Sequence, residues 1–248
     1  MRDARNLEDL ERRIPDCALC PRLRKWCERV AVEKRAAWRN FEYWGKPVPS
    51  FGDHEARLLI VGLAPGAHGG NRTGRIFTGD RSGDWLFRAL YETGFASQPA
   101  SSHRGDGLTL NDAYVTAVVR CAPPANKPAP QERDRCLPYL KEEFRLLSRC
   151  RVIVALGGYA WDGILRALKD LGSAPLFNTR FGHGAEMEVG PYLLLGSYHP
   201  SQQNTFTGRL TAPMLRSVFE RARNRLGSSS RAKSKSASPL SRTSLGSS

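Results

Sequence analysis

The stretch RLLIVGLAPGAHGGNRTGRIFTGD, residues 57–80, decides the fold, because it joins a continuous apolar run to a long glycine-rich loop. The apolar run, residues 57–63, is typical of a strand buried on both faces of a parallel sheet. Seven of the 22 residues from 62 to 83 are glycine, so the backbone there comes close to another group. The segment 84–94, closed by Gly94, is then predicted to be an amphipathic helix.

The same alternation of strand and helix continues along the chain. After a helical basic segment and an aromatic packed loop, we expect strands over residues 113–120, 151–157 and 192–198, and helices over residues 131–149, 158–171 and up to about 226. This alternation predicts an α/β fold with a parallel sheet and helices on both faces. Ligands of such sheets bind outside the carboxyl ends of the strands. Three unusual loops fall there: the glycine-rich loop, CAPPANKPAP (121–130) and HPSQQNTFTG (199–208).

The composition favours an acidic partner. The 248 residues carry a formal net charge of +14, for which nucleic acid is the first candidate and an anionic membrane surface the second. No run approaches the roughly 18 apolar residues that cross a bilayer, and the N-terminus has no apolar signal segment. We therefore expect a cytoplasmic, nucleoid-associated protein. Residues 1–227 are predicted to form one domain, and residues 228–248, with ten serines, four cations and no acid, a disordered basic tail.

Four of the six cysteines are spaced as metal ligands. Cys17 and Cys20 form a C-x2-C pair, Cys121 follows the second predicted strand, and Cys136 lies 15 residues further on. Four thiolates in this arrangement suit a [4Fe–4S] cluster or a structural zinc, and spacing alone does not separate the two. The other two cysteines, at positions 27 and 150, are interpreted as core or surface thiols.

The glycine-rich loop carries the candidates for chemistry. It has neither the ending of a phosphate-binding Walker loop nor a dinucleotide fingerprint. Phe77 is placed to stack on a base, and Arg72 and Arg75 suit an anion. Asp80 is the only carboxylate of the loop, which makes it the candidate general base or cation stabiliser. Capping of the following helix explains Asp80 equally well.

Two long motifs, GLAPGAHGGNRTGRIFTGD and HPSQQNTFTGRLT, together with VVRCAPPANKP and the four cysteines, closely resemble family 5 uracil-DNA glycosylases. The resemblance covers about residues 15–225. It implies a three-layer α/β/α sandwich with a central four-stranded parallel sheet. It also implies a structural [4Fe–4S] cluster on the four cysteines, which favours iron over zinc.

The resemblance further implies an activity and the residues that perform it. The enzyme would flip uracil out of double-stranded DNA and hydrolyse its N-glycosidic bond, as a monomer and without lyase activity. Asp80, Asn126 and His199 match the positions that carry function in the family. His199 would hydrogen-bond the departing base, while Asp80 or Asn126 would stabilise the sugar cation or orient water.

Base and DNA contacts are assigned on the same basis. Gly62, Leu63, Phe77 and Ala117 would surround the flipped base. Related branches of the superfamily carry polar residues where this chain has Leu63 and Ala117, so we expect a less discriminating pocket that also accepts hypoxanthine and other deaminated bases. The candidates for DNA contact lie in the two long motifs: Arg72, Arg75, Gln202, Gln203, Asn204, Phe206 and Arg209. A non-catalytic module that binds damaged DNA on the same fold is the alternative.

Overall fold

The computed structural model describes residues 3–173 and 180–235, with side chains described as far as residue 227. One six-stranded sheet lies at its centre, in the order β1-β3-β2-β4-β6-β5. The four inner strands are parallel: β3 (Ala113–Ala117), β2 (Leu58–Gly62), β4 (Val152–Leu156) and β6 (Tyr192–Ser197). The predicted four-stranded parallel sheet is therefore confirmed. Two antiparallel edge strands extend it: β1 (Phe51–Gly52) and β5 (Glu186–Val189).

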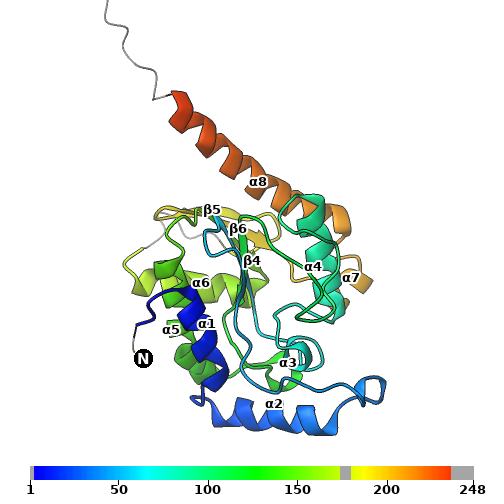
Figure 1. Cartoon of the computed structure of the whole chain (residues 1–248). Coiled ribbons are helices and arrows are strands. Elements are labelled where there is room, and N and C mark those ends of the chain that lie inside the picture. The colour runs from blue at the N-terminus through cyan, green and yellow to red at the C-terminus, as the bar shows by residue number, and fades with distance from the viewer. Residues whose placement is uncertain (1–2, 174–179, 236–248) are drawn as a thin grey trace, which may run out of the picture.

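Two layers of helices cover the sheet (Figure 1). One layer consists of α1 (Leu7–Arg13), α2 (Pro21–Glu33), α5 (Pro130–Leu146) and α6 (Gly158–Asp170). The other consists of α4 (Arg81–Glu92) and α8 (Ala212–Lys235). Successive side chains of a strand face opposite sides of the sheet, so Leu59 and Val61 pack in the first layer, while Leu58 and Ile60 pack in the second. This confirms the three-layer sandwich.

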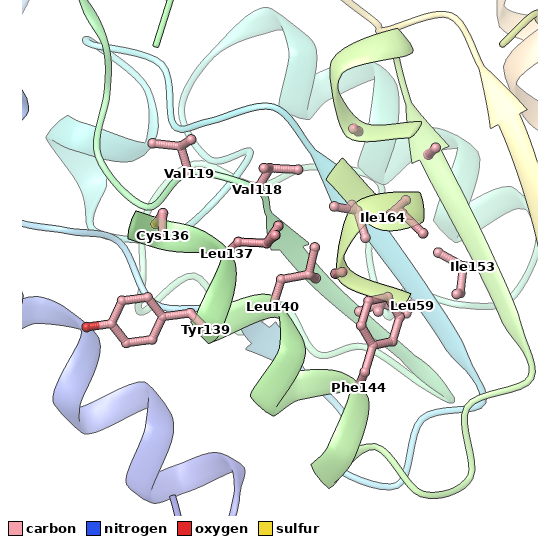
Figure 2. Close-up of a cluster of buried hydrophobic side chains, with 14 of the residues drawn as sticks. Leu59, Val118, Val119, Cys136, Leu137, Tyr139, Leu140, Phe144, Ile153 and Ile164 are labelled. Carbon is pink, nitrogen blue, oxygen red and sulfur yellow. The ribbon is translucent and has the colours of Figure 1, made fainter. Parts of the chain in front are cut away.

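Figure 2 shows the core of the first layer, where Leu137, Leu140 and Phe144 of α5 pack toward the sheet. On the same helix Cys136 lies near Val119, just beyond the end of β3, and Tyr139 points away toward the N-terminal part of the chain. α5 thus joins the hydrophobic core to the region of the predicted metal ligands.

Short elements connect the layers at the ends of the strands. They are the helices α3 (Gly70–Thr73) and α7 (Gln202–Phe206) and the 3-10 turns η1 (Ile14–Asp16), η2 (Ala36–Trp38) and η3 (Pro124–Asn126). The last helix, predicted to end near residue 226, continues to Lys235 and so includes the first residues of the serine-rich segment. Residues 236–248 of the predicted tail lie outside the described residues. Within the described part of the chain, no helix is long and apolar enough to cross a membrane.

Candidate active site

The glycine-rich loop after β2 is held together by its own arginines. Arg72 donates from Nε to the carbonyl of His68 (2.8 Å) and from a terminal nitrogen to the carbonyl of Gly79 (2.7 Å). Its guanidinium also lies 3.9 Å from the centroid of the Trp38 ring. Arg72 is buried, so in this structure its guanidinium serves the loop, and its predicted phosphate contact stays a prediction.

Arg75 is also internal. It forms an ion pair with Asp106 at 2.6 Å, and both side chains are buried. The same guanidinium donates to Ser101 Oγ (2.8 Å) and Thr78 Oγ1 (3.0 Å). The Arg75 guanidinium thus donates to partners within the protein, and its predicted DNA contact stays a prediction. Both arginines fix the shape of the loop instead.

Phe77 lies where a planar base would need a platform. Its backbone is left-handed (φ 51°), an uncommon conformation for an aromatic residue. The ring packs against Gly62 at the carboxyl end of β2, and a Cβ on Gly62 would come within 2.6 Å of the ring. Gly62 pairs in register with Ala117 of β3, which is fully buried, and Leu63 follows half-buried. The four predicted base-binding residues therefore lie together.

Asp80 caps the following helix, which is one of the two interpretations that the sequence offered. One carboxylate oxygen accepts a hydrogen bond from the N–H of Gly83 (3.0 Å) and caps α4. The other oxygen, Oδ2, lies against the backbone of Gly66 and Gly69, where a side chain on Gly69 would collide with it. Burial raises the pKa of Asp80, against the lowering effect of its backbone hydrogen bonds. A carboxylate with a raised pKa beside a ligand-binding loop suits charge stabilisation or proton transfer.

His199 follows β6 and faces the same place. Its ring centroid is 5.8 Å from that of Phe77, with the two planes 31° apart. Burial lowers the pKa of His199 to about 4, so the imidazole is neutral at physiological pH and can donate one hydrogen bond. Asn204 donates from Nδ2 to the His199 carbonyl (2.9 Å). Asn204 therefore helps to hold the His199 loop, while its predicted DNA contact stays a prediction.

The rest of this motif remains open to solvent. Ser201 caps α7, and Gln202 and Gln203 are exposed on its first turn. Phe206 is 66% exposed, with the guanidinium of Arg81 4.5 Å from its ring centroid. Arg209 is exposed beside the ring of Tyr198, also at 4.5 Å.

Asn126 lies on the loop between β3 and α5, at the end of η3. Its backbone is left-handed, as is that of Ala125, and its side chain is exposed. The structure thus presents Asn126 to solvent, whereas Asp80, Phe77 and His199 lie on the loops after β2 and β6.

Sequence reasoning did not find two polar anchors of the glycine-rich loop. Tyr43 Oη lies 3.0 Å from His68 Nδ1. Asn71 is fully buried and donates from Nδ2 to the carbonyl of Cys27 on α2 (3.3 Å). Asn71 lies within the glycine-rich motif and Tyr43 lies outside it, and their partners are 44 and 25 residues away, so no local pattern indicates the contacts.

The predicted metal ligands come from different segments of the chain. Cys17 follows η1, Cys20 precedes the first turn of α2, Cys121 follows β3 and Cys136 lies on α5. All six cysteines are free thiols. Within the described residues, no group of three or more His, Cys, Asp or Glu side chains has the geometry of a bound metal ion.

The surroundings of these thiols nevertheless suit thiolate ligands. Burial raises the pKa of Cys136, and the charges of Cys17 and Cys20 raise it further. The N–H of Arg120 donates to Cys136 Sγ at 3.3 Å. Burial raises the pKa of Cys20, against the lowering effect of the Arg135 charge. Cys27 donates from Sγ to the carbonyl of Ala122 (3.5 Å), next to Cys121. Cys27 is buried, as expected of a core thiol.

The fold is an α/β sandwich whose candidate site, with Phe77, Asp80 and His199, lies at the carboxyl ends of its strands. Comparison with known proteins identifies the family. A sequence model described as "Uracil DNA glycosylase superfamily" matches residues 49–223. A type-5 uracil-DNA glycosylase of Mycobacterium tuberculosis is 52% identical over 221 residues, covering 88% of this chain and 81% of that protein. One of Thermus thermophilus is 50% identical over 212 residues, covering 85% and 94%. A type-4 enzyme of Archaeoglobus fulgidus is 29% identical over 185 residues, covering 73% and 80%. The chain belongs to the uracil-DNA glycosylase superfamily and, within it, to the type-5 branch.

Proposed function

We propose that this protein is a monofunctional DNA glycosylase that removes uracil from double-stranded DNA by hydrolysis. One observation carries the proposal: a stacking platform (Phe77), a buried carboxylate (Asp80) and a neutral imidazole (His199) lie on two adjoining loops at the carboxyl edge of the sheet. Family membership and the curated relatives support uracil as the base.

Each of these groups has a place in the reaction. The target base must leave the duplex, and the flipped base would stack on Phe77. As the N-glycosidic bond breaks, negative charge grows on the base and positive charge on the sugar. The neutral His199 ring would donate a hydrogen bond to the base anion, a contribution of roughly 3–4 kcal/mol by analogy with other oxyanion-binding donors. Asp80 would stabilise the sugar cation or orient water, and Asn126 would assist from the rim of the site.

The walls of the pocket support a broad choice of base. Leu63 and Ala117 offer no side-chain amide or carboxylate to read the Watson–Crick edge. The carbonyls of Gly62 and Leu63 already accept hydrogen bonds from Val118 and Val119 (both 3.0 Å). A site without dedicated polar partners rejects analogues only weakly. Hypoxanthine and other deaminated bases would therefore be excised as well.

The four cysteines Cys17, Cys20, Cys121 and Cys136 would hold a [4Fe–4S] cluster. The chemistry of the donor set fits, because all four are free thiols at the same end of the first layer, three of them buried, and the N–H of Arg120 donates to Cys136 Sγ. Hydrogen bonds to the sulfurs are a known means of tuning such clusters. When bound, the cluster would supply cross-links between the N-terminal segment and α5 rather than chemistry on the base.

The residues in and around α7 would contact the DNA duplex. Phe206, the most exposed large apolar side chain of the motif, would enter the space left by the flipped base, with Gln202 and Gln203 beside it. Arg209 would contact phosphate. The enzyme would act as a monomer on chromosomal DNA in the cytoplasm, with the basic segment 228–248 adding loose electrostatic attraction.

A base-release assay tests the proposal. Labelled duplexes carrying one U·G, U·A or hypoxanthine·T pair are incubated with the protein and then treated with alkali to cut abasic sites. We expect cutting at all three, strongest at U·G, and its loss in His199→Ala. Tight binding to every duplex without base release would instead establish the damage-binding module. Brown colour and about four irons per chain would support the cluster, whereas a colourless zinc protein would contradict it.

A further inference from the structure

The segment between α2 and β1 packs along the outer side of the glycine-rich loop. The N–H of Trp44 donates to the carbonyl of Arg72 (2.9 Å), and Tyr43 Oη meets His68 Nδ1. The ring of Trp38 stacks on the Arg72 guanidinium. These three contacts give the segment a fixed position relative to the site.

The opposite side of the segment faces solvent and carries cations. Arg35 and Arg39 are exposed, and Phe41 is 50% exposed, with its ring edge-on to Trp38 at 5.2 Å. Among the ion pairs formed within residues 3–173 and 180–235, neither arginine has a carboxylate partner. We name these three residues, Arg35, Arg39 and Phe41, the η2 rim.

The η2 rim is close to the reacting centre. Arg72 connects the η2 rim to the site. Its guanidinium contacts the Trp38 ring on one side and the carbonyl of Gly79, next to Asp80, on the other. Arg35 is near enough to His68 that its charge adds to the effect of burial in lowering the pKa of that histidine. In Figure 1 the segment after α2 lies beside α3 and apart from α7.

We propose that the η2 rim is a second DNA-binding surface, which holds the phosphate backbone flanking the flipped nucleotide on the side away from α7. The proposal rests on the proposed glycosylase function. Arginine is the usual phosphate contact in protein–DNA interfaces, and Arg72 and Arg75, which the motif offers for this purpose, are buried and paired. On the Trp38 side of the glycine-rich loop, Arg35 and Arg39 of the η2 rim are exposed cations, whereas Arg81 and Arg209 lie on the α7 side.

Contacts to the DNA backbone on both sides of the target nucleotide would affect how the duplex is held. Flipping requires the backbone on both sides of the target to be held while the base leaves the stack. The α7 side offers Phe206 and Arg209, and the η2 rim offers two guanidinium groups and an apolar ring. The rim therefore contributes to affinity and to holding the duplex, and the bond-breaking step itself depends on the groups inside the pocket.

The test compares the double variant Arg35→Gln/Arg39→Gln with the wild-type holoprotein on a U·G duplex. Glutamine keeps the polar stem while it removes the charge. Each phosphate contact contributes about 0.9 to the slope of log affinity against log salt, so losing two contacts lowers that slope by about 1.8 and the affinity at 0.1 M salt by roughly 60-fold. The matched control Arg166→Gln/Lys169→Gln removes two exposed cations of α6, on the far side of the molecule in Figure 1.

Two outcomes would overturn the proposal. One is unchanged affinity and salt slope in the η2 rim variant while the wild type excises uracil. The other is an equal loss in the α6 control, which would mean that net charge alone is responsible. If the wild type binds DNA but releases no base, the proposed glycosylase function is wrong. The slopes of log affinity against log salt for the two variants would then still show whether the η2 rim binds DNA.

Discussion

Replacing Gly62 by alanine adds one methyl group at the end of β2, directly under the Phe77 ring. The added carbon would lie 2.6 and 2.7 Å from two ring carbons. Unstrained carbon contacts are about 3.5–4.0 Å, so the ring must retreat by roughly 1 Å. The backbone of Phe77 has little freedom to follow, because it is left-handed and its carbonyl packs against Gly83.

This displacement should lower both the free energy of unfolding and the rate of base release. Overpacking a tight site costs about 1–3 kcal/mol of unfolding free energy. A displacement of about 1 Å in a group that positions the substrate costs about 10²-fold in rate. We therefore expect Gly62→Ala to fold, with a lower Tm, and to release uracil from a U·G duplex about 100 times more slowly in single turnovers.

The matched control is Gly105→Ala. Gly105 is exposed, and a Cβ there meets nothing nearer than 3.8 Å, so rate and stability should stay near wild type. Circular dichroism and thermal melting show whether both variants are folded. A folded Gly62→Ala protein that releases uracil at the wild-type rate would refute the assignment of Phe77 as the base platform.

Three other predictions follow from the buried contacts. Asp106→Asn leaves Arg75 buried without its charge partner and should destabilise the fold by about 3–5 kcal/mol in urea unfolding; a change below 1 kcal/mol would mean that Arg75 is free to serve DNA. Burial lowers the pKa of His199 to about 4, so the native protein binds this proton only at a lower pH than the unfolded chain does. The free energy of unfolding should therefore fall as the pH drops from about 6.5 to 4. His199→Gln should remove that part of the decline, and an unchanged stability profile would contradict it. Asn71→Ala releases the glycine-rich loop from Cys27 of α2 and should lower the single-turnover rate about tenfold at unchanged DNA affinity, while equal loss of affinity would indicate general unfolding instead.

The inner sheet was predictable because burial on both faces leaves a simple signature. β2, β3 and β4 are fully buried runs, and each is followed by a loop and a helix. The edge strands leave no comparable signal. β1 has only two residues, and β5 alternates exposed and buried residues over the four positions of EMEV.

Part of the candidate site could be predicted from the sequence, namely the part in which one loop contains both the candidate residues and the glycines packed around them. Phe77 and Asp80 lie on the glycine-rich loop, and the glycines around them are explained by close approach of ring and carboxylate. The burial of Arg72 and Arg75 could not be predicted, because their partners Trp38 and Asp106 are distant in sequence and no local pattern shows that a charge will be buried.

Asn204 illustrates the same limit on a shorter scale. A polar residue in an exposed, glutamine-rich motif favours DNA contact, but the turn of α7 brings its amide back to the His199 carbonyl. The structure therefore leaves Phe206, Gln202 and Gln203 as the motif residues that face solvent.

The most direct test of the account is a mass balance on one turnover. The holoprotein, in excess over a U·G duplex, is sampled for free uracil by mass spectrometry and for strand integrity before and after alkali. We predict one uracil released per duplex, intact strands before alkali and cut strands after it, with Asp80→Asn slowed by at least about 100-fold. Bound duplex with no free uracil, or strands already cut before alkali, would contradict hydrolysis by this site.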